Sequence, residues 1–267
     1  MKISELLTES GSKLLSFDQT RNLLKTDYSE AYQRAVKGHR IYRGFGSMEI
    51  KYHLLQPMRG RESINNNNFY TLILNNAERF SNLPNRSVIT STNNKTASVF
   101  SASDRSLALI LPKNGTTLAM CPTNDIWNTV PKKVSGTKLG YYEFSKIIER
   151  WIHWMGIGFH KIKTFEDLMS IQKVFEKIKQ EDPDKHIIIS GYLQTHLESF
   201  KVDKEFLEEV IDTGPVKLFN LLQPQDFKTF KISEFETSDN NEVWFDNEFI
   251  AITVQFLDTI FNESPAS

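Results

Sequence analysis

The sequence has little cysteine, no long apolar run and no excess of either charge. A single Cys among 267 residues excludes a disulfide framework and any Cys-cluster metal site. No segment approaches the roughly 20 consecutive apolar residues that cross a bilayer. The 32 Lys and Arg are matched by 33 Asp and Glu, which argues against binding of nucleic acid through bulk positive charge. We therefore expect a cytoplasmic protein with no membrane partner and no strong nucleic-acid signal.

Several common catalytic and cofactor-binding motifs are also absent from the sequence. It contains neither a G-x-G-x-x-G nor a G-x-x-x-x-G-K-[ST] segment, so neither a Rossmann domain nor a P-loop is expected. The six His are scattered, and none forms an H-E-x-x-H motif or a pair at metal-ligand spacing. We expect no bound metal.

Large apolar side chains are abundant, and they predict a packed core. The chain has 19 Phe, 8 Tyr and 4 Trp, far more than a disordered segment carries. Residues 3–37 show helical spacing of apolar positions, and short runs rich in β-branched and apolar residues predict strands. The predicted strands are 39–45, 87–92, 107–112, 116–121, 242–245 and 249–254. The last two are separated by Asp246-Asn247, which predicts a hairpin.

The middle of the chain has a different pattern from its two flanks. Residues 141–180 place aromatic and aliphatic residues at helical spacing, and 192–211 repeat that pattern. Strand-like segments return after 216. We therefore expect an α+β fold, a single domain over 1–267 in which 141–215 is a mainly helical insertion.

Three separate segments carry the candidate functional residues. Arg43 lies near a strand end beside Gly44, and three consecutive hydroxyl residues, 90–92, lie in a second strand. Glu242 opens an otherwise apolar strand. Each feature alone is typical of ordinary structure, because strand hydroxyls and terminal carboxylates are common in β-proteins.

Taken in order, these segments resemble the Arg-Ser-Glu group of mono-ADP-ribosyltransferases, which includes bacterial toxins and tailed-phage enzymes. IYRG resembles the family's first active-site strand, and ITSTNNKTASVF resembles its hydroxyl motif with the following helix. LALILPKNGTTLAMCP is similar to the next two strands, and EVWF followed by FIAI resembles the catalytic-Glu strand and the last strand. The resemblance covers most of 28–131 and 216–254. It implies a split mixed or antiparallel sheet core with N-terminal helices.

The resemblance also implies a reaction, the transfer of ADP-ribose from NAD to a macromolecular acceptor with release of nicotinamide. Glu242 would stabilise the oxocarbenium-like ribose in the transition state. Arg43 would hold the pyrophosphate or ribose as a planar donor. Thr90 would hydrogen-bond and orient Glu242, with Thr92 on the same face of the strand and Ser91 on the other.

The remaining cofactor contacts are implied by the same alignment of motifs. Phe100 would pack on nicotinamide or fill the core, the core being favoured, and Arg105 would make a second phosphate contact or lie solvated in its loop. The full set expected to contact NAD is Arg43, Gly44, Thr90, Ser91, Thr92, Phe100 and Arg105.

The sequence departs from the family pattern ahead of the catalytic carboxylate. Many members have Glu or Gln two residues before that Glu, where this chain has Asn240, which hydrogen-bonds but cannot act as a base. Asn240 would position the acceptor, but another acceptor chemistry, or NAD hydrolysis alone, stays open. A second register places Glu248 in the catalytic position, although residues 246–248 better suit a turn.

The partners that the resemblance implies are NAD and a host protein in a bacterial cytoplasm, with the chain acting there or carried in a phage virion. Two alternatives stand beside the transferase. One is an NAD glycohydrolase, and the other is a non-catalytic virion or interaction protein that keeps the same fold.

Overall fold

The computed structural model describes residues 11–46, 51–57, 72, 75–76, 80–129, 141–158, 162–199, 202–215, 226–237 and 240–262. The chain forms two compact units. The sheet unit comprises Met1–Arg61, Asn82–Ile126 and Asp226–Ser267, and the helical unit comprises Glu62–Ser81 and Trp127–Gln225. The predicted α+β class is confirmed. The helices expected in 141–215 belong to the helical unit, which also includes 62–81.

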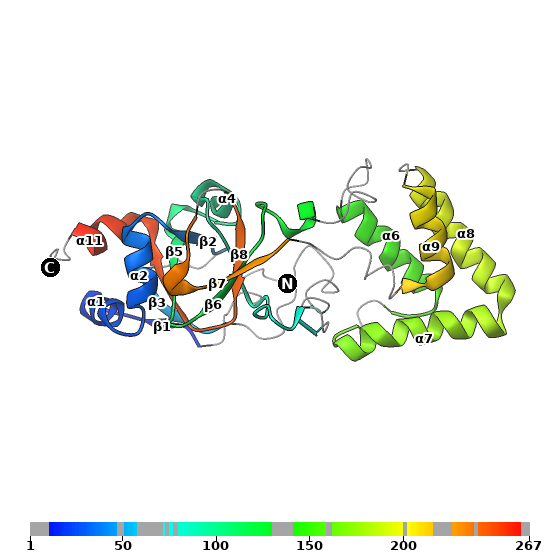
Figure 1. Cartoon of the computed structure of the whole chain (residues 1–267), viewed down its shortest axis with the longest axis horizontal. Helices are drawn as coiled ribbons and strands as arrows, with labels where there is room; N and C mark the ends of the chain where they lie inside the picture. Colours follow the sequence, from blue (N-terminus) through cyan, green and yellow to red (C-terminus); the bar gives the residue numbers. More distant parts are fainter. Residues whose placement is uncertain are drawn as a thin grey trace. The chain divides into compact units, whose positions relative to one another are not determined.

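The sheet unit is built on one nine-stranded sheet, in the order β1-β3-β9-β5-β2-β4-β8-β6-β7, and every pairing in it is antiparallel (Figure 1). Its strands are β1 Lys13–Leu14, β2 Ile41–Gly44, β3 Tyr52–Leu55, β4 Val88–Ser91, β5 Leu107–Pro112, β6 Thr117–Met120, β7 Lys228–Lys231, β8 Glu242–Phe245 and β9 Phe249–Thr253. The predicted strands at 107–112 and 242–245 therefore begin and end where the sequence pattern placed them.

The predicted hairpin between 242–245 and 249–254 is wrong. β8 pairs with β4 and β6, whereas β9 pairs with β3 and β5, so the two strands lie in different parts of the sheet. The rings of Phe245, at the end of β8, and Phe249, at the start of β9, pack edge to face with their centroids 5.7 Å apart. The short connection thus carries the chain from one part of the sheet to another.

The helices of the sheet unit are short. They are α1 Phe17–Lys25, α2 Ser29–Val36, α4 Asn94–Ser98 and α11 Leu257–Asn262, with single 3₁₀ turns at Asp104–Ser106, Ile232–Glu234 and Val254–Phe256. Of these helices, α1 and α4 begin at the polar caps Ser16 and Asn93. Ser16 and Gln19 form a capping box that begins α1. The expected helical region 3–37 is thus two helices preceded by β1, and its first residues lie outside the described part of the chain.

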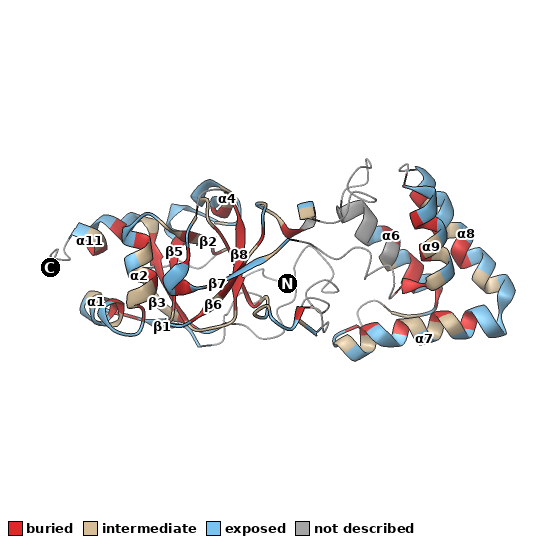
Figure 2. Ribbon diagram, viewed as in Figure 1, coloured by how far each residue is buried: buried red, intermediate tan, exposed pale blue. Residues whose placement is uncertain are grey.

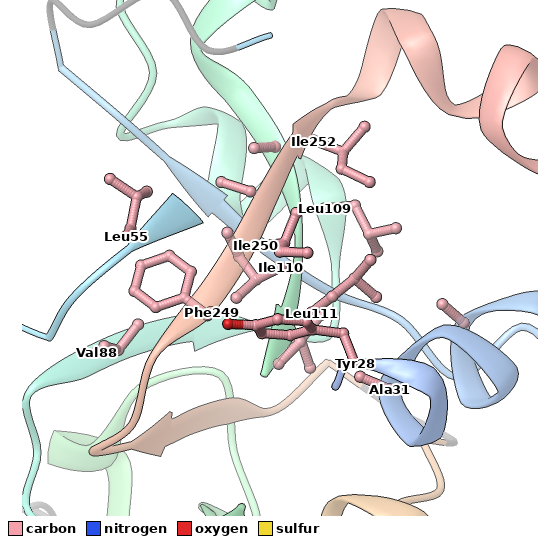
Figure 3. Packing of buried hydrophobic residues seen from close by; sticks show 14 of the residues in the cluster. Tyr28, Ala31, Leu55, Val88, Leu109, Ile110, Leu111, Phe249, Ile250 and Ile252 are labelled. Carbon is pink, nitrogen blue, oxygen red and sulfur yellow. The ribbon is translucent and has the colours of Figure 1, made fainter. Parts of the chain in front are cut away.

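The core of the sheet unit consists of aliphatic and aromatic side chains from the central strands and the helices packed on them. Figure 3 shows Leu109, Phe249 and Ile252 from neighbouring strands together with Tyr28 and Ala31. All of these side chains are at most 3% exposed. Figure 2 shows β8 as buried and β7 as largely exposed. All five residues of β9 are buried as well. The strand that carries Glu242 therefore lies inside the unit rather than at its rim.

The helical unit contains α6 Tyr141–Trp154, α7 Phe165–Glu181, α8 Pro183–Ser199 and α9 Lys204–Thr213. Thr164 and Asp167 form the capping box of α7, and Pro183 begins α8. Trp151, Phe175 and Phe206 are buried between these helices. Among the described residues, no helix is both long and apolar enough to cross a bilayer.

Candidate functional site

The three segments singled out by the sequence occupy neighbouring strands. β2 carries Arg43, β4 carries Thr90 and Ser91, and β8 begins with Glu242. These strands are consecutive in the sheet order, with β4 in the middle. Segments roughly 50 and 150 residues apart in the chain therefore meet at one place in the fold.

A close approach between backbones explains the glycine next to Arg43. A Cβ atom on Gly44 would lie 2.4 Å from the carbonyl oxygen of Ala97 and 2.7 Å from backbone atoms of Phe100 and Ser101. No side chain larger than hydrogen fits there, because all three neighbours are backbone atoms. The helix after the hydroxyl motif, α4, thus packs directly on β2.

The register between the strands decides which side chains share a face. Ser91 lies directly opposite Glu242 on one side and opposite Tyr42 on the other, whereas Thr90 lies opposite Val243. Directly opposed residues of an antiparallel pair point to the same face, and consecutive residues alternate. Ser91 therefore shares the face of Glu242, and Thr90 points to the other face.

The expected hydrogen bond from Thr90 to Glu242 is wrong for this reason. The Thr90 hydroxyl donates instead to the carbonyl oxygen of Val243, at 2.8 Å. Arg43 follows Tyr42 and so lies on the Thr90 face, where its guanidinium carbon is 5.1 Å from the centre of the Phe45 ring. The structure thus brings the three strands together but does not bring Arg43, Thr90 and Glu242 onto one face.

Glu242 is buried and held by donors that the sequence did not reveal. Its Oε1 accepts from Arg86 Nη2 at 2.7 Å and Nε at 3.2 Å, and its Oε2 accepts from the backbone N–H of Ile126 at 3.2 Å. The side chains of Arg86 and Glu242 are only 10% and 9% exposed. This arrangement is a buried, charge-assisted pair.

Both donors lie near the points where the chain passes between its two units. Ile126 is the last residue of one stretch of the sheet unit, and Arg86 follows shortly after Asn82, where that stretch begins. The backbone of Glu242 is fixed to the same region, because its N–H donates to the carbonyl of Thr123 at 2.8 Å. The two ends of this stretch, one containing Arg86 and the other containing Thr123 and Ile126, therefore both hold Glu242.

Asn240 lies two residues before Glu242, at the expected acceptor-side position. Its Oδ1 accepts from the Ser91 hydroxyl at 3.3 Å and from the Thr96 hydroxyl at 3.1 Å. The Ser91 hydroxyl also accepts from the backbone N–H of Asn93, the N-cap of α4. Asn240 thus ties the start of β8 to the hydroxyl motif and its helix.

Three further predicted contacts lie at the edges of this region. Thr92 accepts a hydrogen bond from the backbone N–H of Asn241 at 2.8 Å. Phe100 is 68% exposed, so the core position favoured for it is wrong, since α4 ends before Phe100 and leaves the ring outside. Arg105 lies exposed in the 3₁₀ turn Asp104–Ser106.

Glu248, the alternative catalytic position, has a different environment. It accepts from the Tyr28 hydroxyl at 2.5 Å and from Gln56, and it pairs with Lys113 at 3.4 Å. Burial raises the pKa of Glu248, but these hydrogen bonds and the Lys113 charge outweigh it and hold the pKa below its usual value. Glu248, directly before β9, thus links the residue before α2 with the residues that follow β3 and β5.

A polar hollow of about 520 Å³ lies elsewhere in the sheet unit, beyond the far end of β8. It is lined by Asn82, Leu83, Pro84, Asn85, Gly115, Thr116, Thr117, Asp246 and Asn247. It contains none of the predicted site residues. No cluster of three or more His, Cys, Asp or Glu that could hold a metal occurs in the described ranges.

Comparison with known proteins adds no relative. No family model matches the chain, and neither a curated protein nor a solved structure matches it.

Arg86 and the Ile126 amide are the contacts that sequence reasoning missed. Arg86 stands in a polar, irregular stretch before the strand at 87–92, where an Arg carries no distinguishing signal. A backbone amide has no sequence signature at all. The folding of 80–87 next to β8, marked by the hydrogen bond from the Trp244 indole to the Pro84 carbonyl at 3.1 Å, brings Arg86 to Glu242. The Ile126 amide arrives from a different segment, which contacts β8 through the bond from the Glu242 N–H to the Thr123 carbonyl.

Proposed function

We propose that the sheet unit is a mono-ADP-ribosyltransferase that cleaves NAD and transfers ADP-ribose to a macromolecular acceptor. The observation that carries the proposal is the adjacency of β2, β4 and β8 in that order. It joins the three motif strands that the resemblance requires to be neighbours. The packing of α4 against Gly44 supports the same alignment, because it explains why the Arg43 position is followed by glycine.

The chemistry assigned to Glu242 is the stabilisation of positive charge on the ribose as nicotinamide leaves. A buried carboxylate acts strongly on a nearby cationic centre, because water screens it little. Ser91 takes the place of Thr90 as the hydroxyl on the Glu242 face, and Asn240 extends that face toward the acceptor. NAD is the ADP-ribose donor, and the acceptor is a host protein.

A second candidate is the non-catalytic protein with the same architecture. Two observations favour it: Arg43 lies on the opposite face from Glu242, and Arg86 already neutralises that carboxylate. In this case the Arg86–Glu242 pair is structural, and the chain acts by binding a partner.

The test uses the full chain with NAD labelled in its adenylate part and a bacterial lysate. We expect nicotinamide release and label on protein, both abolished by Glu242→Gln. Glu248→Gln is the matched control, because it removes a hydrogen-bonded carboxylate directly before β9, and it should retain activity when folded.

Each other outcome selects an alternative. Nicotinamide release without labelled protein identifies an NAD glycohydrolase. Absence of both products from the folded wild type leaves the non-catalytic protein. If Glu248→Gln abolishes activity and Glu242→Gln does not, Glu248 is the catalytic carboxylate.

A further inference from the structure

We propose that Arg86 is the positioning residue of Glu242, the role that the sequence assigned to Thr90. This inference rests on the proposed function, since it concerns how the same carboxylate is oriented for the reaction. Thr90 cannot fill the role, because its side chain lies on the face opposite to Glu242 and its hydroxyl donates to the backbone carbonyl of Val243.

The donors fix the carboxylate at both oxygens. Two N–H groups of the planar Arg86 guanidinium reach Oε1, and the Ile126 amide reaches Oε2. A guanidinium has its donors in a fixed fork, so it restricts the orientation of its partner more than a single ammonium does. The Glu242 side chain is therefore held in one rotamer with its Oε2 defined in space.

The count of acceptor positions shows what remains for a substrate. An ionised carboxylate offers about four lone-pair positions, two on each oxygen. Arg86 uses the two on Oε1, and Ile126 uses one on Oε2. Within the part of the chain that the structure describes, the remaining position on Oε2 is the one that a ribose hydroxyl can occupy.

Burial makes this orientation effective. Both side chains are about nine-tenths removed from solvent, so water competes weakly for their hydrogen bonds. A preorganised carboxylate needs little rearrangement as charge develops on the ribose. Arg86 thus acts through Glu242 and does not itself contact the reacting atoms.

The test compares kcat and KM for NAD in nicotinamide release by the full chain, at a temperature at which each variant is folded. We expect Arg86→Met to lower kcat by about 100-fold, the size of effect expected when a reacting group is misplaced. The KM for NAD should change much less than kcat. Arg86→Lys keeps the charge but loses the fork, so it should recover part of kcat.

The matched control is Arg34→Met, which removes another largely buried Arg of the sheet unit. Arg34 pairs with Glu236 at 3.1 Å and donates to the Phe235 carbonyl. This variant should lose stability and keep kcat. If Arg86→Met does not fold, Arg86→Lys decides.

The inference is overturned if a folded Arg86→Met variant has the kcat of the wild type, or if Arg86→Lys does when Arg86→Met does not fold. A rise in kcat also overturns it, because Arg86 would then be an inhibitory contact. If the wild type itself releases no nicotinamide, the proposed function fails instead.

Discussion

The Arg86–Glu242 pair gives the sharpest prediction about stability. Its partners are 10% and 9% exposed, and three N–H groups donate to the carboxylate. Removing one partner takes away the opposite charge from a buried ion, which typically costs about 3–5 kcal/mol. We therefore expect Arg86→Met and Glu242→Leu each to lower the free energy of unfolding of the sheet unit by about that amount.

The double variant Arg86→Met/Glu242→Leu should be much more stable than the sum of the single effects implies. Replacing both members of a buried pair by apolar residues of similar volume is often neutral, so we expect it within about 1–2 kcal/mol of the wild type. The coupling in this double-mutant cycle should thus reach several kcal/mol. The control cycle uses Arg34 and Glu236, whose carboxylate is 74% exposed, and its coupling should stay below about 1 kcal/mol.

The assay must report on the sheet unit alone, because two compact units need not unfold together. Urea unfolding with pulsed hydrogen exchange, read by mass spectrometry on the peptide containing Val243–Phe245, meets this need, since β8 is buried along its length. Additive single effects would refute the reasoning. They would mean that the Arg86 guanidinium and the Glu242 carboxylate do not depend on each other in solution.

Four further predictions concern other parts of the molecule. Gly44→Ala should destabilise the sheet unit by about 1–3 kcal/mol through overpacking, because its Cβ would meet backbone atoms of α4 and Ser101. Gly191→Ala in α8, where a Cβ meets nothing within 4 Å, should raise the free energy of unfolding of the helical unit, measured with urea. A lower free energy of unfolding for the variant would contradict the open space around Gly191. Glu248 has a lowered pKa in the folded state, so its contribution is present at neutral pH and lost as the pH falls through that pKa. The stability gap between wild type and Glu248→Gln should therefore shrink between about pH 5 and pH 3, and a constant gap would contradict this. His186 has a pKa lowered by burial and by the Lys179 charge, so acidification below about pH 6.5 should destabilise the helical unit. His186→Phe, beside the Phe175 ring, should reduce that acid sensitivity in circular dichroism melts, and unchanged sensitivity would assign it to other groups.

Much of the secondary structure follows from local sequence. Short apolar runs predicted the strands at 107–112 and 242–245, and apolar residues at helical spacing predicted helices within 141–180. Both signals are local, because neighbouring residues in the sequence show which faces of an element are to be buried. The reason for the glycine beside Arg43 is, by contrast, a close approach of α4 that only the folded structure shows. The α+β class is therefore a property that the sequence determines by itself.

Strand order and register were decided only by the tertiary structure. The hairpin predicted at Asp246-Asn247 depends on a local turn signal, but the packing of Phe245 and Phe249 and the bonds to Glu248 accompany a crossing between different parts of the sheet. Register has period two, so a shift of one residue exchanges the faces of a strand. A difference of one residue in register therefore decides that Ser91, and not Thr90, lies on the face of Glu242. The partner of Glu242 itself, Arg86, is 156 residues away in sequence, and no local pattern encodes a contact made by chain segments that meet only when folded.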